Sequence, residues 1–263
     1  MAENKLADMS TEFAVKILNL TDGIMANENQ FKGKAQFYNS RPAYPQDCID
    51  YLINKFNLNP GSVIADIGAG TGILTKPFLE FGCSAYAVEP NEDMFLELNK
   101  QLSQYSKVEF LKTSAEETGI PSYSCDAVVV GTAFHWFDKY KFRAECNRIL
   151  KNNKNIAILR IANNTEADKQ IEKVRHYSEQ DLTEAKQFFG EGFVEHINFE
   201  YVQSFDEERY VNHLLSSATA PLPNDANFDA YVNKCRNVFN KHFKNGFAEL
   251  PFVVNCYIGR LDT

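Results

Sequence analysis

The sequence predicts an α/β fold in which a mostly parallel sheet is covered by helices on both faces. Apolar segments of strand length alternate with segments of helical periodicity from about Ser62 to Ala162. The segment CDAVVVGTA at 125–133 is continuously apolar, which is typical of a strand buried on both faces. Three glycines at alternate positions, in ADIGAGTG, follow the first of these strands. In such sheets ligands bind beyond the carboxyl ends of the strands, so the glycine-rich loop marks the expected site.

The predicted elements follow one another in a regular order. Strands are expected at 62–67, 84–90, 108–112, 125–133 and 155–162, and helices at 45–56, 73–82, 91–104 and 139–150. Pro77 weakens the second helix unless it falls in the first turn. Asn91 is the expected N-cap of the third helix. The last strand is expected in PFVVNCYIG, near the carboxyl end of the chain.

Composition narrows the class of protein. The chain has 263 residues, a net charge of −8 and 44% hydrophobic residues, which fits one globular domain with additions. The acidic balance disfavours a nucleic-acid partner. The six cysteines form no CxxC pair and the histidines show no metal-ligand spacing, so we expect a reduced, cytoplasmic protein without a metal. No stretch is long and apolar enough to cross a membrane. Residues 1–30 are expected to form a loosely attached arm, or alternatively a lid.

The glycine-rich loop favours a ligand that carries an ammonium group and a ribose. Gly68, Gly70 and Gly72 let a ligand lie against the backbone, but Ile73 stands where a dinucleotide fingerprint would have its third glycine. The sequence also has no P-loop pattern. Asp66 lies just before the glycines, and Glu89 ends the next strand, where it can accept hydrogen bonds from both ribose hydroxyls. SAEE and TAFHWF follow the third and fourth strands, so one ligand can touch all these segments.

These segments resemble a known family. VIADIGAGTG, VEP, SAEE and CDAVVVGTAFHWF are similar to the class I S-adenosylmethionine-dependent methyltransferases. FKGKAQFYNSRPAYP at 31–45 and LPFVVNCYIGRLD near the end resemble the small-molecule group that includes trans-aconitate methyltransferase-like enzymes. The resemblance covers roughly residues 31–262. It implies a Rossmann-like seven-stranded sheet of order 3-2-1-4-5-7-6 with the last strand antiparallel, and one methyltransferase domain over 31–263. The implied cofactor is S-adenosylmethionine, with S-adenosylhomocysteine as the product.

The resemblance also implies roles for individual residues. Asp66 would face the methionine amino group, and Glu89 would bind the ribose. Arg41 would pair with the cofactor carboxylate, although it could instead hold an acidic substrate. The expected cofactor-binding residues are Arg41, Asp66, Gly68, Ala69, Gly70, Glu89, Pro90, Met94, Ser114, Ala115, Glu116 and Thr132.

The expected catalytic residues are His135, Trp136 and Tyr38. An aromatic face attracts a sulfonium cation, and an imidazole can take a proton from an attacking acid or hydroxyl. The alternative is that Trp136 and its aromatic neighbours only pack, and that His135 forms a wall of the site without acting as a base. Tyr38 would close over the site.

Direct in-line methyl transfer to a small carboxylate, hydroxyl or carbon acceptor is the predicted function. A non-catalytic cofactor-binding protein and a nucleotide-dependent oxidoreductase are the alternatives. Helical insertions at about 163–198 and 206–245 are expected to cover the acceptor side. Tyr177, Phe188, Phe189 and Phe193 either roof a pocket there or pack a helix on the sheet. KNNKN at 151–155 replaces the turn usual in the family. The oligomeric state is left open.

Overall fold

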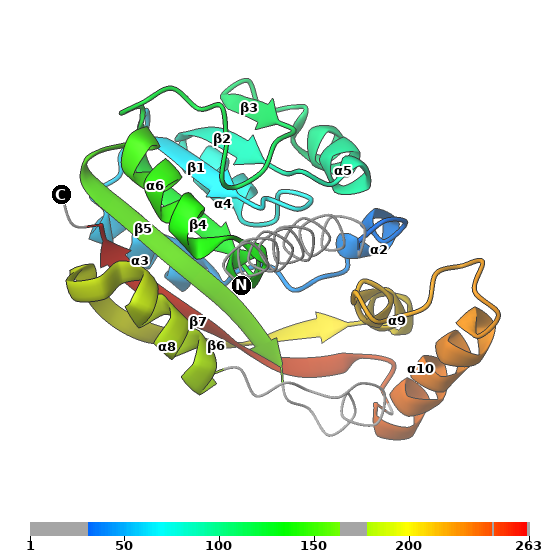
Figure 1. Ribbon diagram of the computed structural model, residues 1–263. Coiled ribbons are helices and arrows are strands. Elements are labelled where there is room, and N and C mark those ends of the chain that lie inside the picture. The colour runs from blue at the N-terminus through cyan, green and yellow to red at the C-terminus, as the bar shows by residue number, and fades with distance from the viewer. Residues whose placement is uncertain (1–30, 164–177, 244, 262–263) are drawn as a thin grey trace, which may run out of the picture.

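A seven-stranded sheet forms the centre of the protein (Figure 1). The computed structural model describes residues 31–163, 178–243 and 245–261. Within them the strand order is β3-β2-β1-β4-β5-β7-β6. The strands are β1 (Val63–Ile67), β2 (Ser84–Val88), β3 (Val108–Leu111), β4 (Cys125–Gly131), β5 (Leu150–Asn163), β6 (Phe193–Phe205) and β7 (Ala248–Arg260).

The pairing of the strands confirms the predicted fold class. β1 to β5 run parallel to one another, whereas β7 is antiparallel to both β5 and β6. The strand order reverses at β1 and β4, which is the switch point where ligands bind in open α/β sheets. β4 is buried along most of its length, as expected for a continuously apolar central strand.

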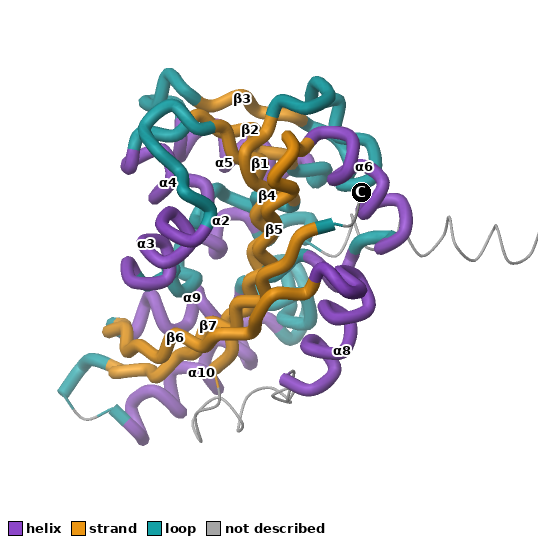
Figure 2. Tube along the Cα trace, turned by 90° about the vertical axis from the view of Figure 1, so that its left-hand side faces the viewer, coloured by secondary structure: helices purple, strands orange, loops and turns teal. Residues whose placement is uncertain are grey.

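Helices cover both faces of the sheet (Figure 2). α3 (Gln46–Lys55), α4 (Thr75–Phe81) and α5 (Glu92–Leu102) contribute to the core on one face. α6 (Lys139–Ile149) and α8 (Ser178–Phe189) pack on the other face, and Figure 2 separates them clearly from α3 and α4. None of the helices in the described part of the chain has the length and apolar character needed to cross a bilayer.

Local sequence chemistry fixes the ends of these helices. The Asn91 side chain accepts a hydrogen bond from the Met94 N–H and caps α5, as predicted. Pro77 is the third residue of α4, where its missing N–H breaks no helical hydrogen bond. Gly82 ends α4 with a φ of 109°, a left-handed conformation that favours glycine.

A third group of elements lies at the far end of β6 and β7. α9 (Glu207–Leu215) and α10 (Phe228–His242) pack with these strand ends into a separate apolar cluster, and the short α2 (Ala35–Tyr38) contacts α9. Figure 1 shows β6 and β7 running out to these helices. The prediction that 206–245 is mainly helical is confirmed.

The predicted helical insertion at 163–198 is described only in part, since residues 164–177 lie outside the described residues. Within 178–198, α8 is helical as expected, but β6 already begins at Phe193, because FVEHINFEYVQSF alternates in burial and pairs with β7. α8 packs on the same face of the sheet as α6. Phe188 and Phe189 are buried there, and the Arg143 guanidinium on α6 donates to the Phe188 carbonyl oxygen. These aromatic side chains therefore pack a helix on the sheet.

Residues 151–154 interrupt the pairing of β5 with β4, and two other predicted features lie outside the described residues. Residues 1–30 and Tyr177 lie outside the described residues. At KNNKN, Leu150 pairs with Cys125 and Asn155 with Ala127, so residues 151–154 form a bulge in β5. Lys154 adopts a positive φ of 44° in this bulge.

The packing of α8 on β7 generates a test. A Cβ atom at Gly259 would lie 2.3 Å from the buried Phe189 ring. We predict that Gly259→Ala lowers the free energy of unfolding by about 1–3 kcal/mol, because the ring must shift within a filled core. Denaturant titration measures the loss. The double variant Gly259→Ala/Phe189→Leu should lose less than the two single variants together, and strict additivity would contradict the described contact.

Candidate active site

A cavity of about 320 Å³ lies at the carboxyl ends of the parallel strands. The chain that follows β1, β2, β3 and β4 supplies one part of its wall, which is where the switch point predicted a site. The segment before α3, the ends of β5 and β7, and α9 supply the rest. Among the described residues, the lining includes every predicted cofactor-binding residue together with Tyr38 and Trp136.

The glycine-rich loop begins directly after β1 and turns sharply. Gly68 and Gly70 have φ values of 73° and 59°, which side chains rarely adopt. A Cβ at Gly68 would lie 2.6 Å from the Ala133 Cβ, so only glycine lets this loop pass the end of β4. The N–H groups of Gly68 and Ala69 both donate to the Val88 carbonyl oxygen at 2.9 Å. The loop is therefore anchored to the end of β2.

Glu89 holds the same loop from the other side. Its carboxylate accepts the Gly70 N–H at 2.9 Å through one oxygen and the Asn91 N–H at 2.9 Å through the other. The side chain is buried yet lines the cavity. Each carboxylate oxygen has more than one lone pair, so Glu89 can still accept hydrogen bonds from a ligand.

Asp66 is the most deeply buried carboxylate of the cavity wall. It is fully buried at the end of β1, and its Oδ2 accepts the Thr75 hydroxyl at 2.6 Å. Oδ1 makes no hydrogen bond within the described part of the chain. Burial raises the pKa of this carboxyl to about 7, although the hydrogen bonds from Thr75 oppose the rise. A buried acceptor without a partner suits an ammonium group of a ligand.

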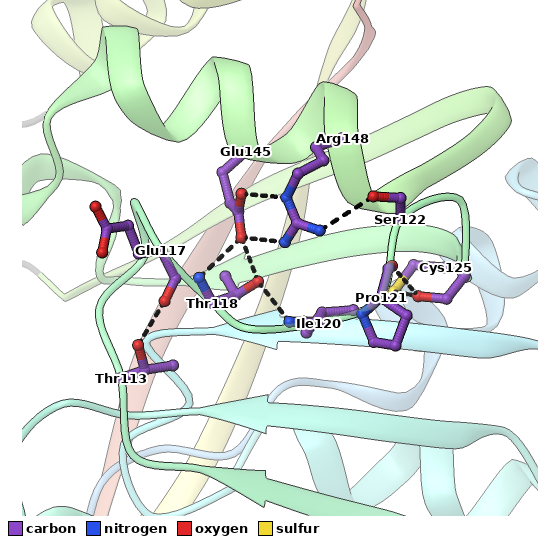
Figure 3. Close-up of polar contacts among 10 residues, drawn as sticks. Thr113, Glu117, Thr118, Ile120, Pro121, Ser122, Cys125, Glu145 and Arg148 are labelled. Carbon is purple, nitrogen blue, oxygen red and sulfur yellow. Dashed lines mark hydrogen bonds and ion pairs between the residues drawn. The ribbon is translucent and has the colours of Figure 1, made fainter.

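A buried network positions the segment after β3 (Figure 3). Glu145 on α6 accepts the Thr118 N–H at 2.8 Å and the Thr118 hydroxyl at 2.5 Å. Arg148 pairs with the same carboxylate. Burial alone would raise the pKa of Glu145, but its hydrogen bonds with Arg148 and Thr118 lower it below its usual value. This network fixes the loop that carries Ser114, Ala115 and Glu116 to the cavity wall.

Glu116 is fixed by a contact of its own. Its side chain accepts the Asp138 N–H at 2.9 Å, at the residue that caps α6. Glu116 is therefore held in place by the backbone at the start of α6.

Thr132, directly after β4, carries backbone strain. Its φ of 57° is a rare conformation for a β-branched residue, and such strain concentrates at functional sites. The Thr132 N–H donates to the Leu159 carbonyl oxygen at 2.8 Å, and its hydroxyl bonds Tyr44. Tyr44 is held against Gly131, where a Cβ would lie 2.5 Å from the phenol oxygen. Burial raises the pKa of Tyr44 far above its usual value, so this phenol stays neutral.

The segment before α3 lies along the cavity and is tied to α9. The Arg41 guanidinium donates to the Ser216 hydroxyl at 2.7 Å and to the Ser216 carbonyl oxygen at 2.9 Å. It also stacks over the Tyr38 ring, 4.7 Å from the ring centroid. The buried Lys34 ammonium donates to the carbonyl oxygens of Ala220 and Pro221. Residues 31–41 are thus fixed by contacts far away in the sequence.

The aromatic turn after β4 divides its side chains between two places. Trp136 lines the cavity and meets Phe31 edge-on, with centroids 6.0 Å apart. His135 does not line this cavity, and its catalytic role stays a prediction. Its Nδ1 lies 2.6 Å from an Arg160 guanidinium nitrogen, and both residues line a separate small hollow together with Asp181. The cause is the 3₁₀ turn Phe134–Trp136, which directs consecutive side chains differently.

The contact with Arg160 ties His135 to β5. A guanidinium can only donate, so the His135 Nδ1 accepts in this contact. Because His135 directly precedes Trp136, the contact also holds the turn that carries Trp136.

Sequence reasoning missed the part of the cavity wall that comes from the second half of the chain. His213 on α9 lines the cavity, although the sequence suggested an ordinary surface or helix residue. Tyr210, Val211, Leu214 and Leu215 form the buried face of α9, and His213 lies at the edge of that face. Nothing in the sequence tells whether this edge meets the cavity or solvent. The other residues missed include Ile161, Asn163 and Phe252.

Comparison with known proteins agrees with this architecture. Residues 65–158 match the model of a family described as "Methyltransferase domain". An uncharacterised methyltransferase of Mycobacterium bovis is 38% identical over 113 residues, which is 42% of this chain and 43% of that protein. An uncharacterised methyltransferase of Schizosaccharomyces pombe is 30% identical over 130 residues, 48% of this chain and 49% of that protein. The chain thus matches less than half the length of these curated relatives.

Solved structures extend the likeness of the fold. A protein of Anaeromyxobacter dehalogenans, described as a proposed type II methyltransferase, superposes with a TM-score of 0.62 at 19% identity and covers 85% of this chain and 99% of its own. A proposed methyltransferase from an antibiotic biosynthesis pathway of Anabaena variabilis gives a TM-score of 0.52 at 20% identity, covering 82% and 98%. These matches concern the fold. Together with the family match over residues 65–158, they confirm the methyltransferase fold.

The buried Asp66 generates a prediction about stability. A folded-state pKa near 7, above the ordinary 3.8, means that the folded protein holds this proton more tightly than the unfolded chain. The resulting stabilisation is complete below pH 4 and is lost as the pH rises through 7. We predict that Asp66→Asn, without ligand, gains roughly 1–4 kcal/mol relative to the wild type between pH 4 and pH 8, measured by urea titration. Asp229→Asn, at an exposed position of α10, serves as the control. A pH-independent difference for Asp66→Asn would contradict the assignment.

Proposed function

We propose that the chain is an S-adenosylmethionine-dependent methyltransferase that methylates a small molecule at a carboxylate, hydroxyl or carbon nucleophile. The observation that carries the proposal is the pair of buried carboxylates, Asp66 and Glu89, on either side of a bare glycine loop in one cavity. A ligand that carries both an ammonium group and a ribose matches this pair. The family match over residues 65–158 supports the same reading.

The residues present fit this cofactor. Asp66 Oδ1, which makes no hydrogen bond in the described structure, would accept from the amino group. Glu89 would accept from the ribose hydroxyls, while Pro90, Met94 and Ser114–Glu116 would surround the adenine. The Arg41 guanidinium has donors beyond the two used by Ser216 and would pair with the cofactor carboxylate.

The protein's own contribution to catalysis is positioning and exclusion of water. When bound, the cofactor supplies a methyl carbon made electrophilic by the positive sulfur. Tyr38, Trp136 and Phe31 form an aromatic wall beside the glycine loop, and aromatic faces stabilise a cation. The wall is held in place by Arg160 and His135 on one side and by Ser216 and Arg41 on the other. Aligning the two reactants in a closed cavity supplies most of the rate in such a reaction.

The cysteines and the net charge support a cellular location and a class of acceptor. All six cysteines are buried and free, which supports a reducing, cytoplasmic location. A net charge of −8 supports a small-molecule acceptor over a nucleic acid. The resemblance of residues 31–45 to trans-aconitate methyltransferase-like enzymes is the basis for proposing that subgroup, with residues 31–263 acting as one domain.

Activity is tested by a screen of small carboxylates, phenols and quinone precursors with S-adenosylmethionine, scored by release of S-adenosylhomocysteine. We expect at least one acceptor to give turnover that depends on the protein. Tight binding of S-adenosylhomocysteine without turnover on any acceptor would favour a non-catalytic binding protein. Preference for NAD over S-adenosylhomocysteine would overturn the proposal.

The role of Glu89 gives a quantitative prediction. We expect Glu89→Ala to weaken binding of S-adenosylhomocysteine by about 1–3 kcal/mol, because hydroxyl donors lose a charged acceptor. Isothermal titration calorimetry measures the change. Glu109→Ala, at an exposed position of β3, is the matched control and should bind like the wild type. Unchanged affinity in a folded Glu89→Ala protein would remove Glu89 from the ribose site.

A further inference from the structure

Part of the cavity wall comes from the second half of the chain. Ile161 and Asn163 come from the end of β5, Phe252 from β7 and His213 from α9. The residues proposed to hold the cofactor come instead from loops after β1 to β4 and from the segment before α3. The cavity therefore has a region, here called the distal end, that the cofactor assignment leaves without a function.

His213 is the residue of the distal end with unused hydrogen-bonding capacity. Its ring packs against Phe205 at 5.5 Å and meets Phe252 edge-on at 6.1 Å, measured between centroids. Its Nδ1 is buried and has no hydrogen-bond partner in the described part of the chain. A polar group in such a place costs free energy unless something binds it. The ring is thus held by its faces, while its Nδ1 makes no hydrogen bond within the described part of the chain.

The end of α9 keeps His213 at the cavity. The Ser216 hydroxyl and N–H both donate to the His213 carbonyl oxygen, at 2.5 and 3.3 Å, and Arg41 donates to Ser216 in turn. His213 is therefore joined through Ser216 to the segment that closes the other side of the cavity.

Burial and the charges around His213 keep it neutral. Burial is the largest cause, and the guanidinium groups of Arg41 and Arg209 act in the same direction, lowering the pKa of the imidazole to about 3. A neutral imidazole offers one N–H donor and one acceptor nitrogen. Such a ring can recognise an oxygen group of a ligand by hydrogen bonding.

We propose that His213 binds the methyl acceptor by a hydrogen bond to an oxygen group, a hydroxyl or a carboxylate, on a small and otherwise apolar molecule. The inference rests on the proposed methyltransferase function and deepens it. Phe252, Ile161 and Trp136 supply apolar walls for the rest of the acceptor. His213 is then the residue that selects oxygen-bearing acceptors over plain hydrocarbons of the same shape.

Three probes of similar shape separate the hydrogen bond of His213 from the contribution of the apolar walls. 2-Phenylethanol, phenylacetate and ethylbenzene share a frame and differ only in the terminal group. Binding to the protein saturated with S-adenosylhomocysteine is measured by ligand-observed NMR. We expect at least one oxygen-bearing probe to bind about tenfold more tightly than ethylbenzene, which corresponds to roughly 1.4 kcal/mol. The alcohol and the carboxylate distinguish which oxygen group the site takes.

The matched variant is His213→Phe, which keeps an aromatic ring between Phe205 and Phe252 and removes both nitrogens. We expect this variant to bind S-adenosylhomocysteine within twofold of the wild type and to lose the preference for the oxygen-bearing probe. On any acceptor found by the screen, KM should rise at least tenfold while the pH profile of kcat keeps its shape.

Several outcomes overturn the inference. They are equal binding of all three probes to the wild type, no binding of any probe, or a preference that survives in His213→Phe. Each leaves the proposed function standing if S-adenosylhomocysteine still binds. A wild-type protein that fails to bind S-adenosylhomocysteine instead removes the proposed function itself.

Discussion

The structure depends on one costly constraint, a carboxylate buried at the end of the first strand with one oxygen left without a partner. Asp66 accepts a hydrogen bond from Thr75 on one side, while Oδ1 meets no donor in the described structure. Burying such a group opposes folding unless a ligand completes its contacts. The glycine loop, Glu89 and the end of β4 are arranged around this carboxylate, with Glu89 fixing the loop that Asp66 begins. The site thus gives up stability of the free protein to gain affinity for a cation.

The second half of the chain completes the wall of the cavity beside the glycine loop. β6 and β7 extend past the parallel strands towards α9 and α10, and His213 on α9 lines the same cavity as the glycine loop. Ser216 binds Arg41, and Lys34 binds the chain after α9, so the segment before α3 is held by a helix about 175 residues away in the sequence. α8, by contrast, packs against α6 and serves the core. Distinct parts of the C-terminal half therefore line the cavity and stabilise the sheet.

Sequence reasoning reached the fold class and the glycine-rich loop through local signals, whereas the strand order came from the family resemblance. Strand and helix periodicity, the Asn91 cap and the alternate glycines are short-range patterns, and all were found where predicted. The start of β6 at Phe193 was missed because antiparallel pairing with β7 outweighed the helical reading of 163–198. His135 lies outside the cavity wall because a 3₁₀ turn changes side-chain direction at each residue. His213 could not be found, since the side of α9 that meets the cavity is set by tertiary packing.

The central claim is that Asp66 receives a cationic group of the cofactor, and proton linkage tests it directly. If the carboxyl has a pKa near 7 in the free protein, binding the ammonium group of S-adenosylhomocysteine at pH 6 must release a proton from it. Calorimetric titration at pH 6 in two buffers with different ionisation enthalpies counts the protons released. The account predicts close to one proton for the wild type and none for Asp66→Asn. Binding of S-adenosylhomocysteine to the wild type without proton release, or equal release by the Asn variant, would contradict it.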